Sequence, residues 1–196
     1  MELWTVLTLG LSLGALHATD ADHVAAVATL LKGRGGLLRA ARVGGLWGLG
    51  HSLTVVLAGG AIVAFRLIIP EAVTQSLELV VAGMLVLLGV RAMRSARLEL
   101  PEGAESTRGG LTSFGIGIVH GLAGSAAVAL AVLTQVRETT VALGYLATFG
   151  VGTIAGMGLV TAALSLPFQA RADLSRKLRM LAGAASVAVG CAQAYA

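Results

Sequence analysis

The sequence lacks most of the features from which soluble enzymes and secreted domains are built. Only 12% of its 196 residues are charged, whereas a soluble domain averages about 25%. Its single cysteine, Cys191, excludes an intramolecular disulfide, a C-x-x-C thiol pair and a Cys-ligated cluster. The sequence has neither the G-x-x-x-x-G-K-[ST] loop of a Walker ATPase nor the H-E-x-x-H motif of an intramembrane metalloprotease. Aromatic residues are few and no basic stretch carries them, so the net charge of +4 does not indicate a nucleic-acid partner.

Apolar residues and glycine are present in excess. Apolar residues make up 56% of the chain, and the mean hydropathy is +0.86. This composition excludes a disordered chain, which needs low hydrophobicity and high charge. The 27 glycines are about twice the usual share, and small residues allow membrane helices to approach one another closely.

Six stretches are long and apolar enough to cross a membrane, since a helical span needs about 20 mostly apolar residues. The alternating pattern of an outer-membrane barrel is absent. We therefore predict an all-α polytopic membrane protein whose six helices lie in residues 3–31, 43–65, 75–93, 111–134, 139–166 and 178–196. Residues 1–196 form one transmembrane domain, in which two three-helix halves, 1–95 and 111–196, are joined by a polar cytoplasmic loop at 96–110.

The positive charges fall in alternate loops. Of the 14 Lys and Arg residues, 12 lie in the loops that follow the first, third and fifth predicted spans or at the span ends beside them, and only Arg66 and Arg137 lie in the other two loops. Solvation of loops alone does not explain this alternation. Because Lys and Arg accumulate on the cytoplasmic side, we predict three cytoplasmic loops and both termini outside, in the cytoplasmic (inner) membrane of a prokaryote.

Two short motifs recur in the two halves, at offsets of 103 and 102 residues. They are Gly14-x-x-His17 with Gly117-x-x-His120, and Gly48-x-Gly50 with Gly150-x-Gly152. Glycine is abundant, so chance is a serious alternative. If the matches are real, the odd number of spans in each half makes the repeat inverted, and the site of such a protein lies near the midplane between the repeats. A 3+3 inverted repeat is therefore our hypothesis.

All four histidines and two aspartates lie within the predicted spans, where ionisable side chains are costly and indicate function. They are His17, Asp20, Asp22, His23, His51 and His120. One lone histidine in a span is more often a satisfied interhelical hydrogen bond. All four histidines of the chain together with two carboxylates favour a common site instead.

Three of these histidines are expected at one depth. At the predicted cytoplasmic ends of the spans, Lys32 lies nine residues after His23 and Arg42 nine residues before His51. His120 likewise lies nine residues after Leu111, where its span begins. Nine helical residues rise about 13–14 Å, close to half of a hydrocarbon core of about 30 Å. His17 lies six residues before His23, which places it about 9 Å nearer the outside on a straight helix.

On an ideal helix, His17, Asp20 and His23 share a face about 120° wide, whereas Asp22 points elsewhere. Either Asp22 has a different partner, such as a ligand histidine that it orients, or the helix is distorted here. Imidazole and carboxylate without thiolate suit divalent Ni, Co, Zn, Cu or Fe. The residue chemistry therefore predicts a divalent transition metal without choosing among these ions.

Three motifs resemble those of a known transporter family. His17-x-x-x-x-Asp22-His23 resembles the H-x-x-x-x-D-H signature of the NiCoT nickel/cobalt transporters. The segment 49–52, Leu-Gly-His-Ser, resembles the L/F-G-H-S segment in the next helix of that family. The segment 119–127 resembles the H-G-L-A-G-S-A segment of its smaller urease-accessory-like relatives.

The resemblance implies permeation of Ni²⁺ or Co²⁺. With Asp20 added from the helix face, the candidate metal-binding residues are His17, Asp20, Asp22, His23, His51, Ser52 and His120. NiCoT permeases usually have eight spans, and related exporters often carry a histidine-rich loop. The six spans expected here, with no histidine in a loop, fit the smaller branch.

We therefore expect a secondary transporter, not an enzyme, that takes up Ni²⁺ and/or Co²⁺ through an intramembrane His/Asp site. A metal exporter and a proton-coupled His/Asp exporter of a small solute are the alternatives. The metal is the substrate, so no permanent cofactor is expected. The lipid bilayer is the expected surrounding and nucleic acid is not a partner, whereas a homo-oligomer or a metal-delivery partner is left open.

Overall fold

The computed structural model describes residues 3–31, 36–98, 107–123, 136, 138–170 and 172–195. Within these ranges the regular structure is entirely α-helical, which confirms the all-α part of the predicted fold class. The core of the predicted cytoplasmic loop, 99–106, lies outside them, and so does the later part of the fourth predicted span, 124–134. The last four residues of the H-G-L-A-G-S-A-like segment, 124–127, belong to that part.

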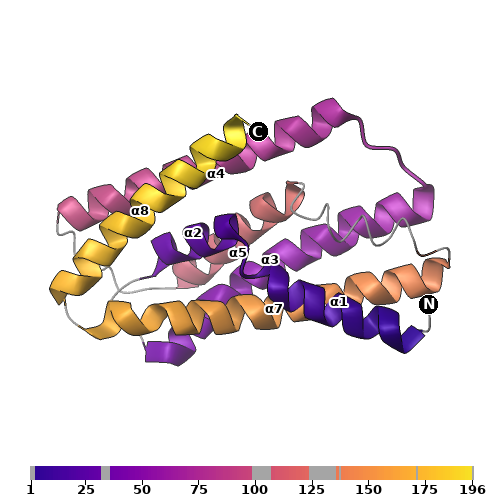
Figure 1. The fold of residues 1–196 in the computed structure, drawn as a ribbon, viewed down its shortest axis with the longest axis horizontal. Coiled ribbons are helices and arrows are strands. Elements are labelled where there is room, and N and C mark those ends of the chain that lie inside the picture. The colour runs from indigo at the N-terminus through magenta and orange to yellow at the C-terminus, as the bar shows by residue number, and fades with distance from the viewer. Residues whose placement is uncertain are drawn as a thin grey trace.

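Seven helices lie in the described ranges (Figure 1). They are α1 (Leu3–His17), α2 (Ala21–Leu30), α3 (Gly36–Phe65), α4 (Glu71–Arg97), α5 (Thr107–Leu122), α7 (Thr139–Ala170) and α8 (Ala172–Ala194). Three of them, α3, α4 and α7, are long and apolar enough to cross a membrane by length and composition. The helices α1, α2 and α5 are apolar but shorter.

The prediction of one continuous helix over 3–31 is wrong. The helix α1 ends at His17 and α2 begins at Ala21. Between them Asp20 is extended, with φ −60° and ψ 146°, and occupies the N-cap position of α2 without capping it through its side chain. Its carboxylate instead accepts a hydrogen bond from His17 Nδ1 at 2.8 Å. The contact with His17 thus engages the Asp20 carboxylate, which would otherwise cap α2.

The helices form two sets joined by α2. The helix α7 packs against both α1 and α3, and α3 also packs against α5. The helices α4 and α8 pack against each other, and α2 contacts both of them as well as α7. Figure 1 shows the resulting arrangement, with the α4–α8 pair along one side and α1 beside α7 along the other. Because α2 lies between the two sets, Asp22 and His23 in its first turn are buried.

Helix directions follow from the order of the close contacts along each pair. The helix α1 runs parallel to α7, and α5 runs parallel to α3. In contrast, α3 is antiparallel to α7, and α4 is antiparallel to α8. Each of α1, α3 and α4 therefore runs opposite to α5, α7 and α8, respectively.

The close contacts of the first half with the second recur in pairs. Gly14 of α1 lies against the carbonyl oxygen of Phe149 in α7, and Gly117 of α5 lies against that of Trp47 in α3. A Cβ atom at either glycine would overlap this oxygen, so only glycine allows the approach. The glycines differ by 103 residues and their partners by 102. A second pair, Gly50 with Phe114 and Gly152 with Leu11, repeats the relation.

The long helices expose large apolar side chains along their middle turns. Leu57 of α3, Leu87 of α4 and Leu159 of α7 have exposed fractions of 64%, 68% and 71%. A soluble monomer rarely exposes extended apolar surface of this kind. Such leucine-covered helices are typical of surfaces that face lipid.

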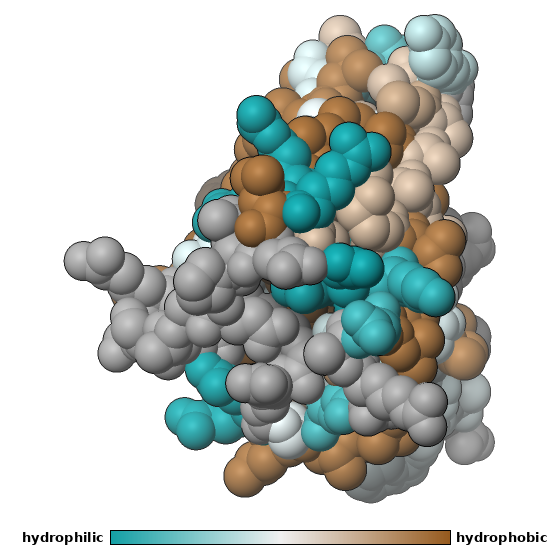
Figure 2. Space-filling model, turned by 90° about the vertical axis from the view of Figure 1, so that its left-hand side faces the viewer, coloured by the Kyte–Doolittle hydropathy of each residue, from teal (hydrophilic) through white to brown (hydrophobic). Residues whose placement is uncertain are grey.

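The described cations of the three predicted basic loops lie at one end of the molecule, where α3 begins, α4 ends and α8 begins (Figure 1). The exposed ones are Arg39, Arg42, Arg91, Arg94, Arg97, Arg176 and Lys177. Figure 2 looks onto this end, where hydrophilic side chains lie between hydrophobic ones. The alternation of charge along the sequence thus corresponds to clustering in space, while the identity of the membrane face stays a prediction.

Candidate metal centre

All four histidines meet at the junction of α1, α2, α3 and α5. The side chains of His23, His51 and His120 are fully buried, and His17 is 6% exposed. Their ring centroids are 4.4 Å apart for His17–His23 and for His23–His120, and 5.0 Å apart for His23–His51. Four titratable rings in contact inside an apolar molecule are unusual, because ionisable groups are costly to bury.

Close helix approach brings His51 and His120 together. The backbone of α5 reaches α3 because Gly117 and Gly121 lie against Trp47 and His51. His120 lies between these two glycines in sequence, and its ring centroid is 5.9 Å from that of His51. Gly117 and Gly121 therefore set the separation of the two helices.

The break between α1 and α2 brings His17 to the same point. A straight helix would separate His17 from His23 by about 9 Å along its axis, but the two ring centroids are 4.4 Å apart. The expected offset of about 9 Å between His17 and His23 is therefore wrong. The chain turns at residues 18–20, so the end of α1 and the first turn of α2 present their histidines to each other.

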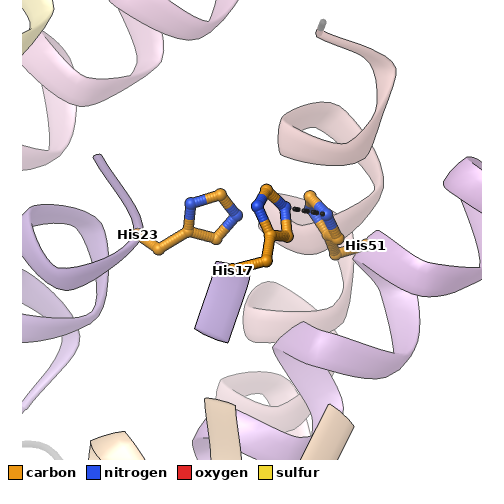
Figure 3. A group of neighbouring side chains, drawn as sticks. All are labelled: His17, His23 and His51. Atoms are coloured by element: carbon orange, nitrogen blue, oxygen red, sulfur yellow. Dashed lines mark hydrogen bonds between the residues drawn. The ribbon is translucent and has the colours of Figure 1, made fainter. Parts of the chain in front are cut away.

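His17, His23 and His51 form the first group of converging ligands. One ligand atom from each lies within 4.8 Å of the others. His17 Nε2 and His51 Nε2 are 3.2 Å apart, and Figure 3 shows a ring nitrogen of His23 directed toward His17. Two nitrogens bound to one tetrahedral metal at about 2.0–2.1 Å lie about 3.3 Å apart. The His17–His51 separation therefore suits two ligands of one ion.

Asp22, His23 and His120 form the second group, whose ligand atoms also lie within 4.8 Å of one another. Asp22 Oδ1 accepts hydrogen bonds from the backbone N–H and from Nδ1 of His23, both at 2.8 Å. Asp22 Oδ2 accepts a hydrogen bond from His120 Nε2 at 3.0 Å. Both alternatives left by the sequence hold, since Asp22 orients histidines and the helix is distorted.

Several buried nitrogens of the cluster have no hydrogen-bond partner among the described residues. They are His23 Nε2, His51 Nδ1, His120 Nδ1 and Trp47 Nε1. An unpaired polar atom in the interior is costly and rare. For His23 the tautomer follows from its contacts, because an ionised carboxylate only accepts hydrogen bonds. Nδ1 then carries the proton, and Nε2 presents a lone pair to the first group, as in metal-bound histidines.

Asp20 and Ser52 take peripheral positions. The Asp20 side chain is 51% exposed and contacts the Nδ1 side of His17, leaving the Nε2 side to His51. The Ser52 hydroxyl donates to the Gly150 carbonyl at 3.1 Å and thereby links α3 to α7. Asp20 therefore lies behind a candidate ligand, while the hydroxyl of Ser52 is engaged in helix packing.

Two residues of the site were missed at the sequence level. The indole of Trp47 lies 5.4 Å from the His23 ring and 5.5 Å from the His120 ring by centroids. Its position four residues before His51, and so on the same face of α3, is a usable signal. Gln193 of α8 donates to Asp22 Oδ2 at 3.5 Å. A polar amide in the final apolar stretch was the signal, but nothing local connects it to a residue 171 positions away.

No protein-family model matches this chain, and no solved structure matches it. Among curated proteins, it is 36% identical over 193 residues to the urease accessory protein UreH of Bacillus sp. (strain TB-90), covering 92% of this chain and 83% of that protein. It is 28% identical over 181 and 176 residues to the chloroplast proteins FOR GROWTH AND FERTILITY 1 and 2 of Arabidopsis thaliana. These matches cover 81% and 82% of this chain, which spans about half the length of the two plant proteins.

Proposed function

This chain belongs to the family of the urease accessory protein UreH, and on that premise we propose that it is a secondary transporter of Ni²⁺ and/or Co²⁺. It moves the ion across the prokaryotic cytoplasmic membrane in the direction of uptake. The ion is cargo, so the protein is neither an enzyme nor the holder of a resident metal. The H-x-x-x-x-D-H signature, which resembles that of the nickel/cobalt transporters, supports this choice of metals.

One observation carries the proposal. Three buried histidines, His17, His23 and His51, direct ligand atoms toward one point at a break in an apolar helix. Neutral imidazole nitrogens supported by carboxylates suit divalent Ni and Co better than Mg or Ca, which prefer oxygen ligands. We propose His17, His23 and His51 as the ligands that receive the ion. Asp20 and Asp22 orient them, Ser52 fixes α3 against α7, and His120 lies on the route beyond.

The helix break supports transport rather than storage of the metal. Thr19, Asp20 and Ala21 are exposed beside the buried histidines, so the break brings the cluster close to the surface of the molecule. Discontinuous helices of this kind form the ion sites of many secondary transporters. In the proposed path, the ion passes the carboxylate of Asp20 before it meets His17.

We also propose six spans arranged as a 3+3 inverted repeat, with α1 and α2 together as one broken span. The glycine contacts that recur at offsets of 102 and 103 residues, and the opposite directions of equivalent helices, support it. An inverted repeat permits alternating access by rocking of one half against the other around a central site. The clustered cations favour the end shown in Figure 2 as the cytoplasmic face.

The test is flux into proteoliposomes. Purified protein in vesicles loaded with a metal-sensitive dye should transport added Ni²⁺ or Co²⁺. The variants His23→Ala and His51→Ala should lose transport, while Cys191→Ser, at an exposed thiol, should not. Wild-type flux in both histidine variants would contradict the assigned site. A protein that neither binds nor moves either ion would contradict the function and favour a proton-coupled exporter, whereas flux only out of loaded, oriented vesicles would indicate a metal exporter.

A further inference from the structure

We propose that the cluster contains two overlapping metal positions that are used in turn and share His23. The first position uses His17, His51 and His23 Nε2, and the second uses Asp22, His120 and His23 Nδ1. This inference rests on the proposed function, because it describes how the transported ion moves within the site. It differs from a single static site in assigning His120 and Asp22 as ligands that receive the ion from the first position.

The two positions follow from two sets of convergent ligand atoms. In each set the ligand atoms lie within 4.8 Å of one another, and His23 is a member of both sets. The His23 ring contacts His17 and His120 at equal centroid distances of 4.4 Å, and it stacks on His120 with an interplanar angle of 27°. No other histidine has a ring contact this short with two others among the described residues. His23 is therefore the geometric link between the two sets.

The two nitrogens of His23 serve different sets. Nδ1 bonds to Asp22 at 2.8 Å, whereas Nε2 is buried without a partner. Figure 3 shows one ring nitrogen directed toward His17 and the other directed away from it. A neutral imidazole carries a proton on one nitrogen and a lone pair on the other. It can therefore bind a metal on one side only, so the two positions exclude each other and the chain holds one ion at a time.

Transfer between the positions needs no net change of protonation. With the ion in the first position, the proton of His23 is on Nδ1 and that of His120 is on Nε2, and both are donated to Asp22. In the second position the ion replaces these protons beside Asp22. Each ring then carries its proton on its other nitrogen, which is Nε2 in His23 and Nδ1 in His120. In the structure neither of these two nitrogens has a hydrogen-bond partner among the described residues. Each ring changes tautomer and remains neutral.

The two positions differ in donor chemistry. The first offers three neutral nitrogens, with the Asp20 carboxylate behind His17 rather than among the ligands. The second offers two nitrogens and the Asp22 carboxylate, which partly neutralises a divalent ion. X-ray absorption at the metal edge distinguishes three bound imidazoles from two. The position that is occupied can therefore be measured without any transport assay.

The experiment compares His120→Gln, His51→Gln and His23→Gln in the full chain, with Thr153→Ala as a buried control outside the cluster. Ni²⁺ binding in detergent, the metal-edge spectrum and flux in proteoliposomes are measured for each. We expect one ion per chain in the wild type and in the His120 and His51 variants. His120→Gln should bind it through three imidazoles and His51→Gln through two, and each should reduce flux more than tenfold. His23→Gln should lose binding altogether.

Three results would overturn the two-position scheme: two ions per wild-type chain, flux of His120→Gln equal to that of the wild type, or the same number of bound imidazoles in the His120 and His51 variants. Failure of the proposed function looks different. In that case the wild type shows no flux of Ni²⁺ or Co²⁺, while the spectra of the variants still decide between one position and two.

Discussion

The helices α3 and α7 are alike in their close contacts and unlike in their chemistry. Gly50 of α3 and Gly152 of α7 lie against the carbonyl oxygens of Phe114 and Leu11 in equivalent ways. The residue after each glycine is fully buried in both helices, but it is His51 in α3 and Thr153 in α7. His51 joins three other histidines, whereas the Thr153 hydroxyl donates to the carbonyl oxygen of Phe149 in its own helix at 2.9 Å.

The difference shows that helix packing does not require the ionisable residues. In α7 the buried position is filled by a threonine that satisfies its hydroxyl within the helix, which costs little. The same holds for the carboxylates, because an offset of 103 pairs Asp20 with Ala123. Apart from the matched pair His17 and His120, the ionisable residues of the cluster therefore have no ionisable counterpart in the other half, and ligand binding is the reason we assign to them.

The largest effect on metal binding is expected when the histidine of the equivalent pair His51 and Thr153 is replaced. His51→Ala should weaken Ni²⁺ binding by more than about 100-fold, because loss of a group that only supports a ligand already costs about 10–100-fold. Thr153→Ala should change binding by no more than about threefold, since its hydroxyl bonds within its own helix. Calorimetry on detergent-purified protein measures both. Equal losses in the two variants would mean that α3 contributes no ligand.

The next effect concerns the carboxylate that holds two histidines. Asp22→Asn should weaken metal binding by about 10–100-fold. An amide has one acceptor oxygen and a donor nitrogen, so it cannot accept from both His23 and His120 as the carboxylate does. The same titration applies, and circular dichroism checks that the helices remain. Unchanged affinity would contradict the role of Asp22 in orienting the site.

The shared packing itself predicts equal destabilisation in the two halves. Gly14→Ala and Gly117→Ala should each lower the free energy of unfolding by about 1–3 kcal/mol, because the new Cβ overlaps a partner carbonyl. Gly115→Ala is the control in α5, since nothing lies within 4 Å of its Cβ position. Denaturant unfolding in detergent measures the three. If only one of the two contact glycines mattered, the equivalence of the halves would fail.

The smallest effect is expected at Asp20. Its side chain is half exposed and contacts only Nδ1 of His17. Asp20→Asn should therefore weaken binding by less than about tenfold, below the range typical of a buried supporting carboxylate. The titration used for Asp22→Asn provides the direct comparison. A loss larger than that of Asp22→Asn would make Asp20 a ligand.

The fold class and the membership of the cluster were predictable because composition and depth carry them. Hydropathy alone predicts helices. A count of nine residues from the cytoplasmic end of each span predicts that His23, His51 and His120 lie together, and their ring contacts confirm it. The Gly-x-x-His and Gly-x-Gly matches also located the glycines that allow close approach.

The break at residues 18–20 was not predictable as such, because 3–31 is apolar enough for one helix and contains no proline. In the structure the Asp20 carboxylate contacts His17 instead of capping α2, and hydropathy does not encode this local contact. Gln193 was missed for the same kind of reason. Its contact with Asp22 depends on how α8 packs against α2, at the opposite end of the chain.

Metal analysis after competition tests the central claim most directly. Purified protein is incubated with equal concentrations of Ni²⁺, Co²⁺, Zn²⁺ and Mn²⁺, separated from free ions, and compared with a variant that combines His17→Ala, His23→Ala and His51→Ala. We predict about one Ni²⁺ or Co²⁺ ion per wild-type chain and none in the variant. A wild type that retains no ion, or a variant that retains as much as the wild type, would contradict the account.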